Sequence, residues 1–275
     1  MFTSNPYATV AGVLSADFMK WYVIVMILAV ILGTLWDVIH KGSAKYFFAT
    51  WKKTQDKGAR PVSGGEMVSM AIQTSLVDVA TSAEFCNQKR RLAHLLTMYG
   101  FILHMAATAL MAFSYPTAAT PTPALVTGLW WIGGLMLCLG GYWFWFFIRV
   151  DVSAEGSSPF RLMKADLFVL SLLASTTLGL LWAAAGGGVG VLFGLYLLAT
   201  AVLFFGVPWS KFAHMFFKPA AALEKRIAKA NGSANMLPTL TRDDPEQQKR
   251  HSMELLQNAP MDMGLGIKRE APRHY

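Results

Sequence analysis

The side chains most able to bind a metal ion or move a proton in this sequence are its six histidines. Three of them, His94, His104 and His214, lie within or beside strongly apolar stretches. An ionisable or ligating side chain is costly to bury in such a stretch, so each is a functional candidate by default. Two imidazoles from different helices can hold one haem iron between them. His94 and His214 are therefore candidate axial ligands of a b-type haem.

Apolar segments long enough to cross a bilayer must position these histidines. The chain is 54% hydrophobic and only 15% charged, with a mean hydropathy of +0.40. A helix needs about 20 mostly apolar residues to span a hydrocarbon core of roughly 30 Å. No basic region precedes the first such segment, so it is not a cleavable signal peptide. The pattern predicts an all-α integral membrane protein, a bundle of five transmembrane helices over residues 21–39, 93–114, 124–148, 166–185 and 189–209.

The basic residues set the expected orientation of this bundle. Lys and Arg gather between Lys41 and Arg91, between Arg149 and Lys164, and from Lys211 onward, whereas the connections 115–123 and 186–188 carry no charge. This alternation predicts an exterior N-terminus and a cytoplasmic C-terminus in the inner membrane of a prokaryote. It also argues against nucleic acid as a partner. The expected parts are an exterior segment 1–20, a membrane domain 21–214 with a cytoplasmic segment 41–91, and a basic tail 215–275.

This topology places His94 and His214 at similar depth near the cytoplasmic face, as a haem held between two helices requires. Arg90, Arg91 and Lys211 are placed to pair with haem propionates. His104 lies ten residues beyond His94 and so about 15 Å deeper. Space for a flat macrocycle is expected at three glycines, Gly100, Gly194 and Gly206.

Other interpretations of the same residues stay open. His40, at the end of the first span, is a competing partner for His94. A histidine in a span can also be a polar contact with no ligand. His251 and His274 lie in the polar tail, and the two cysteines, with no CxxC motif, are expected to be free thiols.

Two helices are expected in the cytoplasmic segment. Residues 45–57 mix Tyr46, Phe48 and other aromatic residues with lysines, which is typical of an amphipathic helix at a membrane interface. Residues 66–80 place their apolar side chains roughly on one helical face. Gly186, Gly187 and Gly188 predict a tight hairpin between the last two spans.

The runs 89–104 (KRRLAHLLTMYGFILH) and 207–214 (VPWSKFAH) resemble the nitrate reductase gamma-subunit family of five-helix, dihaem cytochromes b. The similarity covers about residues 20–225. Within that family the approach to His94 is most similar to the adenylylsulfate reductase membrane anchor and to the membrane subunit of the quinone-interacting oxidoreductase. The resemblance implies a subunit that carries electrons between a membrane quinone and a soluble enzyme on the cytoplasmic face.

The resemblance also implies roles for particular residues. His94 and His214 match the ligands of the haem nearer the cytoplasm, and His104 matches one ligand of a deeper haem. The position of that haem's second ligand, eighteen residues before His214, holds Tyr196 instead. One haem b is therefore expected and a second is doubtful. The alternative for His104 is a polar residue bonded to Tyr196 or to a backbone carbonyl.

Together these inferences favour a membrane subunit of a respiratory redox complex, an electron-transfer subunit and not a stand-alone catalyst. Its expected partner is a cytoplasmic iron–sulfur or flavin oxidoreductase, plausibly adenylylsulfate reductase, with quinone as the diffusible partner. The alternative is a cofactor-free membrane anchor for such an enzyme. A solute transporter is less favoured, because the spans hold no acidic or basic residue near the membrane centre apart from the histidines.

Overall fold

A computed structural model of the chain describes residues 4–83, 85, 87–150, 158–210, 215, 217–235 and 237. All regular secondary structure in these residues is helical. The chain forms two compact units, a bundle unit (residues 1–43 and 87–215) and a three-helix unit (residues 44–86 and 216–275). The segment predicted to be cytoplasmic and part of the predicted tail thus contribute to one unit. The finer division into exterior, membrane and cytoplasmic parts stays a prediction.

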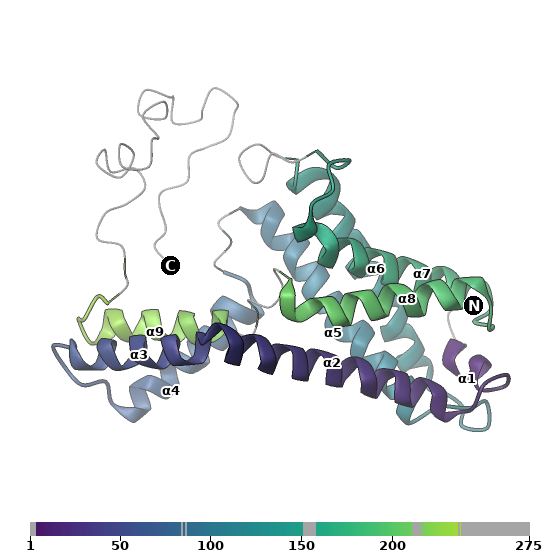
Figure 1. Cartoon of the computed structure of the whole chain (residues 1–275), viewed down its shortest axis with the longest axis horizontal. Coiled ribbons are helices and arrows are strands. Elements are labelled where there is room, and N and C mark those ends of the chain that lie inside the picture. Colours follow the sequence, from purple (N-terminus) through teal and green to yellow (C-terminus); the bar gives the residue numbers. More distant parts are fainter. Residues whose placement is uncertain are drawn as a thin grey trace. The chain divides into compact units, whose positions relative to one another are not determined.

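The bundle unit contains five helices that are long and apolar enough to cross a membrane (Figure 1). Each coincides with a predicted apolar stretch, which confirms the all-helical class and the five candidate spans. Two of the helices change their winding at the end, α6 into a π-helix and α8 into a 3₁₀ turn. The bounds are α2 Asp17–Lys41, α5 Gln88–Phe113, α6 Ala124–Trp143 with η2 Phe144–Ile148, α7 Leu167–Ala184, and α8 Val191–Gly206 with η4 Val207–Trp209.

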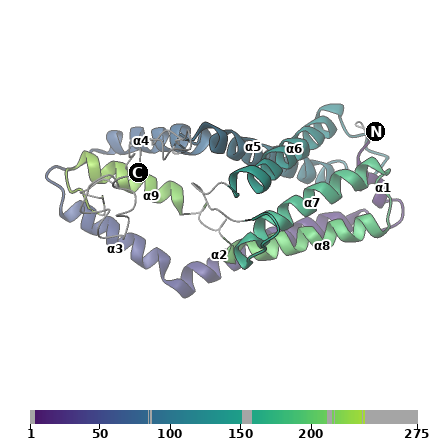
Figure 2. The ribbon, with the colours of Figure 1, turned by 90° about the horizontal axis from the view of Figure 1, so that it is seen from above.

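Helices α5 and α6 pack with their backbones in direct contact, side by side in both Figure 1 and Figure 2. A Cβ atom added to Gly133 would lie 2.6 Å from the backbone nitrogen of His104, and one added to Gly100 would lie 2.6 Å from that of Leu137. Small residues allow this approach, which maximises van der Waals contact between helices. Gly100 therefore admits the neighbouring helix and leaves no room for a macrocycle, whereas Gly194 and Gly206 face open space.

The connection between α7 and α8 is the tight hairpin that the glycines predicted. Gly186 and Gly187 adopt φ angles of 100° and 70°, which side chains other than hydrogen rarely tolerate. The indole nitrogen of Trp182 donates a hydrogen bond to the Gly188 carbonyl at 2.8 Å. The turn thereby fixes a large aromatic side chain within the bundle core.

A short N-terminal helix, α1 (Pro6–Val10), also packs into this core. The Asn5 side chain caps it by accepting hydrogen bonds from the backbone nitrogens of Tyr7 and Ala8. Pro6 occupies the first turn, where its missing N–H costs nothing. The Tyr7 side chain is buried, with its ring centroid 5.5 Å from that of Trp182.

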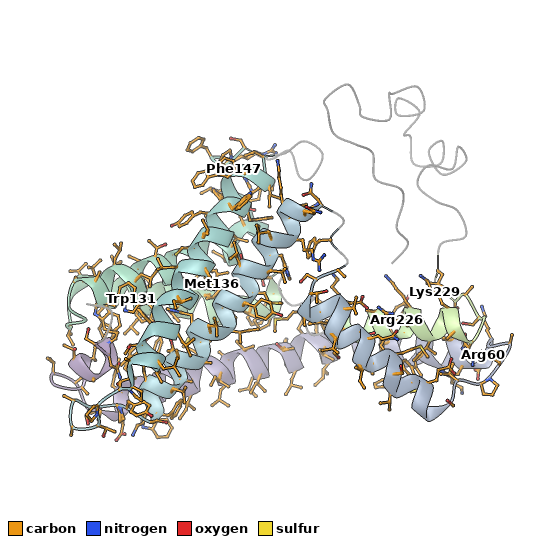
Figure 3. All side chains as sticks on the ribbon, turned by 180° about the vertical axis from the view of Figure 1, so that it is seen from behind. Arg60, Trp131, Met136, Phe147, Arg226 and Lys229 are labelled. Carbon is orange, nitrogen blue, oxygen red and sulfur yellow. The ribbon has the colours of Figure 1, made fainter. Side chains whose placement is uncertain are left out.

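Polar side chains join the helices of the three-helix unit. The Thr54 hydroxyl donates to the Glu224 carboxylate at 2.8 Å, and the Asn231 side chain donates to the Thr54 carbonyl at 2.8 Å. Arg226, labelled in Figure 3, binds both carboxylate oxygens of Asp78. These contacts join α3 and α4, the two helices predicted over 45–57 and 66–80, to α9, which was not predicted. The bounds are α3 Ser43–Asp56, α4 Gly64–Gln73 with π-helix η1 Thr74–Ala80, and α9 Lys218–Ala230.

Candidate functional site

The candidate site is a closed ring of hydrogen bonds between α5 and α6. His104 Nδ1 lies 2.8 Å from the Trp130 carbonyl, the Trp130 indole donates to the Thr108 hydroxyl at 3.0 Å, and that hydroxyl donates to the His104 carbonyl at 2.8 Å. All three side chains are buried. Hydrogen bonds are stronger in a low-dielectric interior than in water, so this ring makes the contact between the two helices rigid. The close helix contact at Gly133 brings the three residues together.

Two tyrosines extend this ring toward α8 and α1. The hydroxyls of Tyr7 and Tyr196 lie 2.9 Å apart, and that of Tyr7 lies 3.5 Å from the Thr108 hydroxyl. Because Thr108 uses its only proton on a carbonyl, Tyr7 must be the donor in their contact. Burial raises the pKa of Tyr7 above its ordinary value, so the phenol keeps its proton. The proton order therefore runs from Tyr196 through Tyr7 to Thr108.

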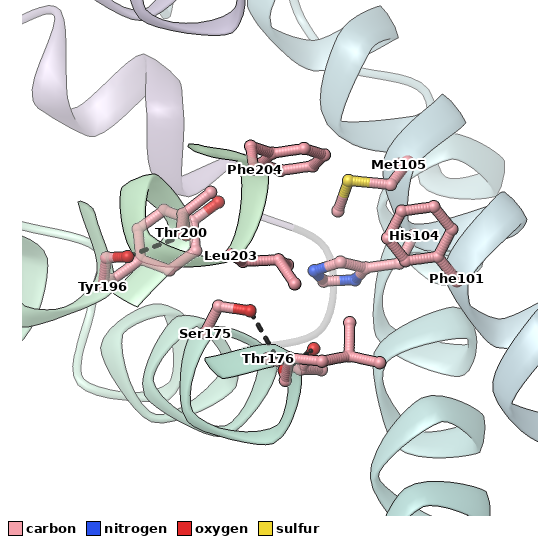
Figure 4. Close-up of a pocket in the computed structure, with 10 residues that line it drawn as sticks. Phe101, His104, Met105, Ser175, Thr176, Tyr196, Thr200, Leu203 and Phe204 are labelled. Carbon is pink, nitrogen blue, oxygen red and sulfur yellow. Dashed lines mark hydrogen bonds between the residues drawn. The ribbon is translucent and has the colours of Figure 1, made fainter. Parts of the chain in front are cut away.

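The ring of hydrogen bonds fixes the tautomer of His104. A carbonyl can only accept, so Nδ1 carries the proton and Nε2 of the neutral imidazole presents a lone pair. The imidazole projects into a small cavity lined by side chains of α5, α7 and α8 (Figure 4). Its volume is about 10 Å³, close to the minimum for one water molecule. Nε2 can thus accept a hydrogen bond or a proton; the residues that line the cavity include Ser175, Thr176, Tyr196 and Thr200.

Two of the three histidines predicted as haem ligands, His94 and His104, lie within the part of the chain that the structure describes. His104 bonds to a backbone carbonyl, as the alternative interpretation of this residue expected. His94 is exposed on α5, and Arg90 lies in the first turn of the same helix with Arg91. His214 and Lys211 lie outside the described residues. Ligation of haem b by His94 and His214, with Arg90, Arg91 and Lys211 near its propionates, stays a prediction.

His40, the competing ligand, stacks on the indole of Trp36 with 6.2 Å between ring centroids. Its side chain is exposed near the end of α2. Within the part of the chain that the structure describes, no group of three or more His, Cys, Asp or Glu side chains could hold a metal ion. The described cysteine, Cys138, is a free thiol.

A second buried polar centre lies where α6 ends. The Arg149 guanidinium, fully shielded from solvent, contacts Asp166 at 2.6 Å and donates to the carbonyls of Ser158 at 2.5 Å and Arg161 at 2.7 Å. It also lies 4.3 Å from the ring centroid of Trp145, within the range of a cation–π contact. Arg149 thereby ties the α6–α7 connection to the end of α6. This role is structural, because the guanidinium is held by four hydrogen bonds and a ring contact within the connection.

Sequence reasoning missed most of this polar core. Tyr7 was assigned no role, although an Asn followed by Pro is a recognisable helix start. Thr108 and Trp130 carry no signal of their own in an apolar stretch. Asp166 and Arg149 flank a connection that was counted only for its positive charge. Their pairing could have been suspected because a lone acidic residue at a span boundary needs a partner.

Comparison with known proteins supplies the family. The sequence model described as "Citrate utilization protein B" (CitB) matches residues 5–235, which include parts of both units. The chain is 28% identical over 194 residues to the citrate utilization protein B of Escherichia coli, a match that covers 66% of this chain and 51% of that protein. The chain thus spans about half the length of this curated relative. No solved structure matches it.

These matches correct the function expected from the sequence. The resemblance to the nitrate reductase gamma-subunit family was wrong, because the family match lies elsewhere and covers the same residues. The functions inferred from that resemblance are therefore wrong as well: a respiratory redox subunit, a membrane anchor for adenylylsulfate reductase, and that enzyme as partner. The family match also contradicts the assignment to cytochrome b, a haem relay, quinone and sulfur metabolism. The chain belongs to the citrate utilization protein B family.

Proposed function

We propose that this chain is a membrane-embedded component of citrate utilization, which crosses the inner membrane of a prokaryote with its five apolar helices. The observation that carries the proposal is the family match over residues 5–235, because it includes the whole bundle. The alternating basic and uncharged connections support an exterior N-terminus and a cytoplasmic three-helix unit. The relative's name supplies the process, citrate utilization.

We further propose that the bundle supports this process without conducting citrate itself. Citrate is a trianion near neutral pH, and an unpaired anion is very costly to move into an apolar interior. Residues 95–148 and 167–210 contain no Lys or Arg that could pair with its carboxylates. The cavity beside His104 has room for about one water molecule. We therefore assign the chain a role in citrate utilization other than the passage of citrate itself.

Within the bundle, His104 is the side chain proposed to act. A buried histidine among apolar helices is retained at a cost, which favours a functional role. Its Nδ1 is engaged by the Trp130 carbonyl, whereas Nε2 is directed at the cavity. We propose that Nε2 accepts a proton or a hydrogen bond during citrate utilization.

Growth of a deletion strain tests the proposed process. Removing the gene should abolish growth on citrate, leave growth on glucose unchanged, and be reversed by the wild-type gene. Uptake of labelled citrate should persist in the deletion strain, because the chain is not the passage. Unchanged growth on citrate would refute the proposal. Loss of uptake, measured within the first minutes, would instead make the chain a citrate transporter.

Two substitutions separate the chemistry of His104 from its packing. His104→Asn keeps a donor near the position of Nδ1 and removes the lone pair of Nε2, so the protein should fold but fail to support growth on citrate. His104→Leu also loses the bond to Trp130 and should be unstable. His40→Asn, on the exposed stacked histidine, is the matched control and should grow normally. Normal growth of His104→Asn would assign His104 a packing role only.

A further inference from the structure

Helix α3 has one buried and one exposed face. The buried face packs through Thr50 and Thr54, which are almost fully covered. The opposite side carries Lys45, Phe48 and Lys52, which lie three and seven residues apart and so share one side of the helix. We call these three residues the lysine–aromatic face; Phe48 is 67% exposed. Lys53 lies on the adjoining flank of the helix.

The charge of this face is positive and uncompensated. No ion pair joins Lys45, Lys52 or Lys53 to any residue that the structure describes. One carboxylate, Asp56, lies near it at the last residue of α3. The described residues of the three-helix unit hold nine Lys or Arg and four Asp or Glu, so an anionic partner is favoured over a cationic one.

The chain itself restricts where α3 can lie. Helix α2, a candidate span, ends at Lys41, and α3 begins at Ser43. Only Gly42 lies between them, with a left-handed φ of 64° that ends α2. If α2 crosses the bilayer, the first residues of α3 must lie at the level of the lipid headgroups. Lysines with aromatic neighbours are the residues that favour this level.

We propose that the lysine–aromatic face rests on anionic lipid headgroups of the bilayer that α2 crosses. The lysines would pair with headgroup phosphates, and Phe48 would enter the boundary with the acyl chains. Each lysine near an anionic surface strengthens association about fivefold, or about 1 kcal/mol. This inference rests on the membrane placement in the proposed function and adds a specific lipid contact for α3. A soluble protein on the same face is the alternative outcome.

Fluorescent labels on the full chain in nanodiscs test the contact. In a Cys86→Ser, Cys138→Ala background, a label is attached through Phe48→Cys, with Ser69→Cys on the exposed side of α4 as control. Discs contain phosphatidylcholine alone or with an equal amount of phosphatidylglycerol, plus a lipid that carries a quencher on its headgroup. Quenching at position 48 should exceed that at position 69 at least about twofold in anionic discs, and less in neutral ones.

Charge substitutions sharpen this test. Lys45→Gln with Lys52→Gln should reduce quenching at position 48 toward the value at position 69, whereas Lys229→Gln, on an exposed residue of α9, should not. Equal quenching at positions 48 and 69 in anionic discs would overturn the inference. If dissolved iodide then quenches the label at position 48, the face is open to water and available to a soluble partner.

A third label separates failure of this inference from failure of the proposed membrane placement. Leu32→Cys lies on an exposed part of α2 and should be quenched by a lipid with its quencher deep in the acyl chain. No quenching there would refute the placement itself. If the cysteine variants do not fold, amine labelling of the wild-type chain decides. Lys45 and Lys52 should then react more slowly than Lys229 in anionic discs, and equal rates would overturn the inference.

Discussion

The two units of this molecule solve the same problem, helix association, with different forces. In the bundle unit, α5 and α6 meet backbone to backbone, and a buried ring of hydrogen bonds joins them through His104, Thr108 and Trp130. In the three-helix unit, pairs such as Arg226 with Asp78 are partly open to water. Salt screens exposed charges much more than buried ones. The units should therefore respond differently to the same perturbation.

The largest loss is expected from Arg149→Met in the bundle unit. The change leaves the Asp166 carboxylate buried without its partner, which typically costs about 3 to 5 kcal/mol. Arg161→Met removes an exposed guanidinium from the same connection and should cost little. Unfolding in mixed micelles, at low and high salt, measures both. A loss for Arg149→Met no larger than for Arg161→Met would contradict the assigned role.

The next largest loss is expected at the contact of α5 with α6. Gly133→Ala forces a methyl group against the backbone nitrogen of His104, so about 1 to 3 kcal/mol of unfolding free energy should be lost. Gly128→Ala on the same helix adds a methyl group where no atom lies within 4 Å. The control should change stability by less than about 0.5 kcal/mol. Equal effects of the two changes would show that backbone contact does not hold these helices.

A smaller and salt-dependent loss is expected in the three-helix unit. Arg226→Gln removes a partly exposed ion pair with Asp78 and should cost at most about 1 kcal/mol. Hydrogen exchange of peptides from α4, η1 and α9 in the full chain measures the effect, with Lys229→Gln as control. Because salt screens exposed charges, the difference should vanish near 1 M salt, where the Debye length is about 3 Å. A difference in exchange that persists at high salt would show that this ion pair, like those of the bundle, is shielded from dissolved ions.

The smallest effect is a pH dependence at the start of α4. The hydrogen bonds that Arg60 donates hold the pKa of the Glu66 carboxyl below its ordinary value. The folded state thus favours the ionised carboxylate, so its contribution is complete above the unfolded pKa and is lost as pH falls through the folded one. Exchange of α4 amides should accelerate below about pH 4. Glu66→Gln should abolish this acceleration, and an unchanged profile would rule out Glu66 as its source.

The same contrast explains what could be predicted from the sequence. The five apolar helices and the hairpin at Gly186 follow from composition and local turn chemistry, so their prediction succeeded. The amphipathic helices around Phe48 and Met70 were also recognisable, because periodicity is local. The contacts that were not predicted are long-range ones. Helix α9 joins α3 through Glu224 and Asn231, and no pattern in the intervening sequence indicates that pairing.

The candidate site shows why histidine spacing misled the functional assignment. His94 and His104 were judged by depth along a helix, but packing decides what an imidazole can do. His104 is bonded through Nδ1 because Gly133 and Gly134 bring α6 close, a consequence of missing side chains on another helix. Short matching runs suggested a cytochrome family, whereas the match over residues 5–235 identified another.

Helix α1 has a consequence for the order in which the bundle is made. Tyr7 is synthesised before its hydroxyl partner Tyr196, which follows 189 residues later in the chain. Its ring partner Trp182 and its neighbour Thr108 also come after it. Domains form progressively as the chain is synthesised, from the N-terminus onward. Helix α1 must therefore wait for the last span before it reaches its final place, so closure of this end of the bundle is a late step of folding.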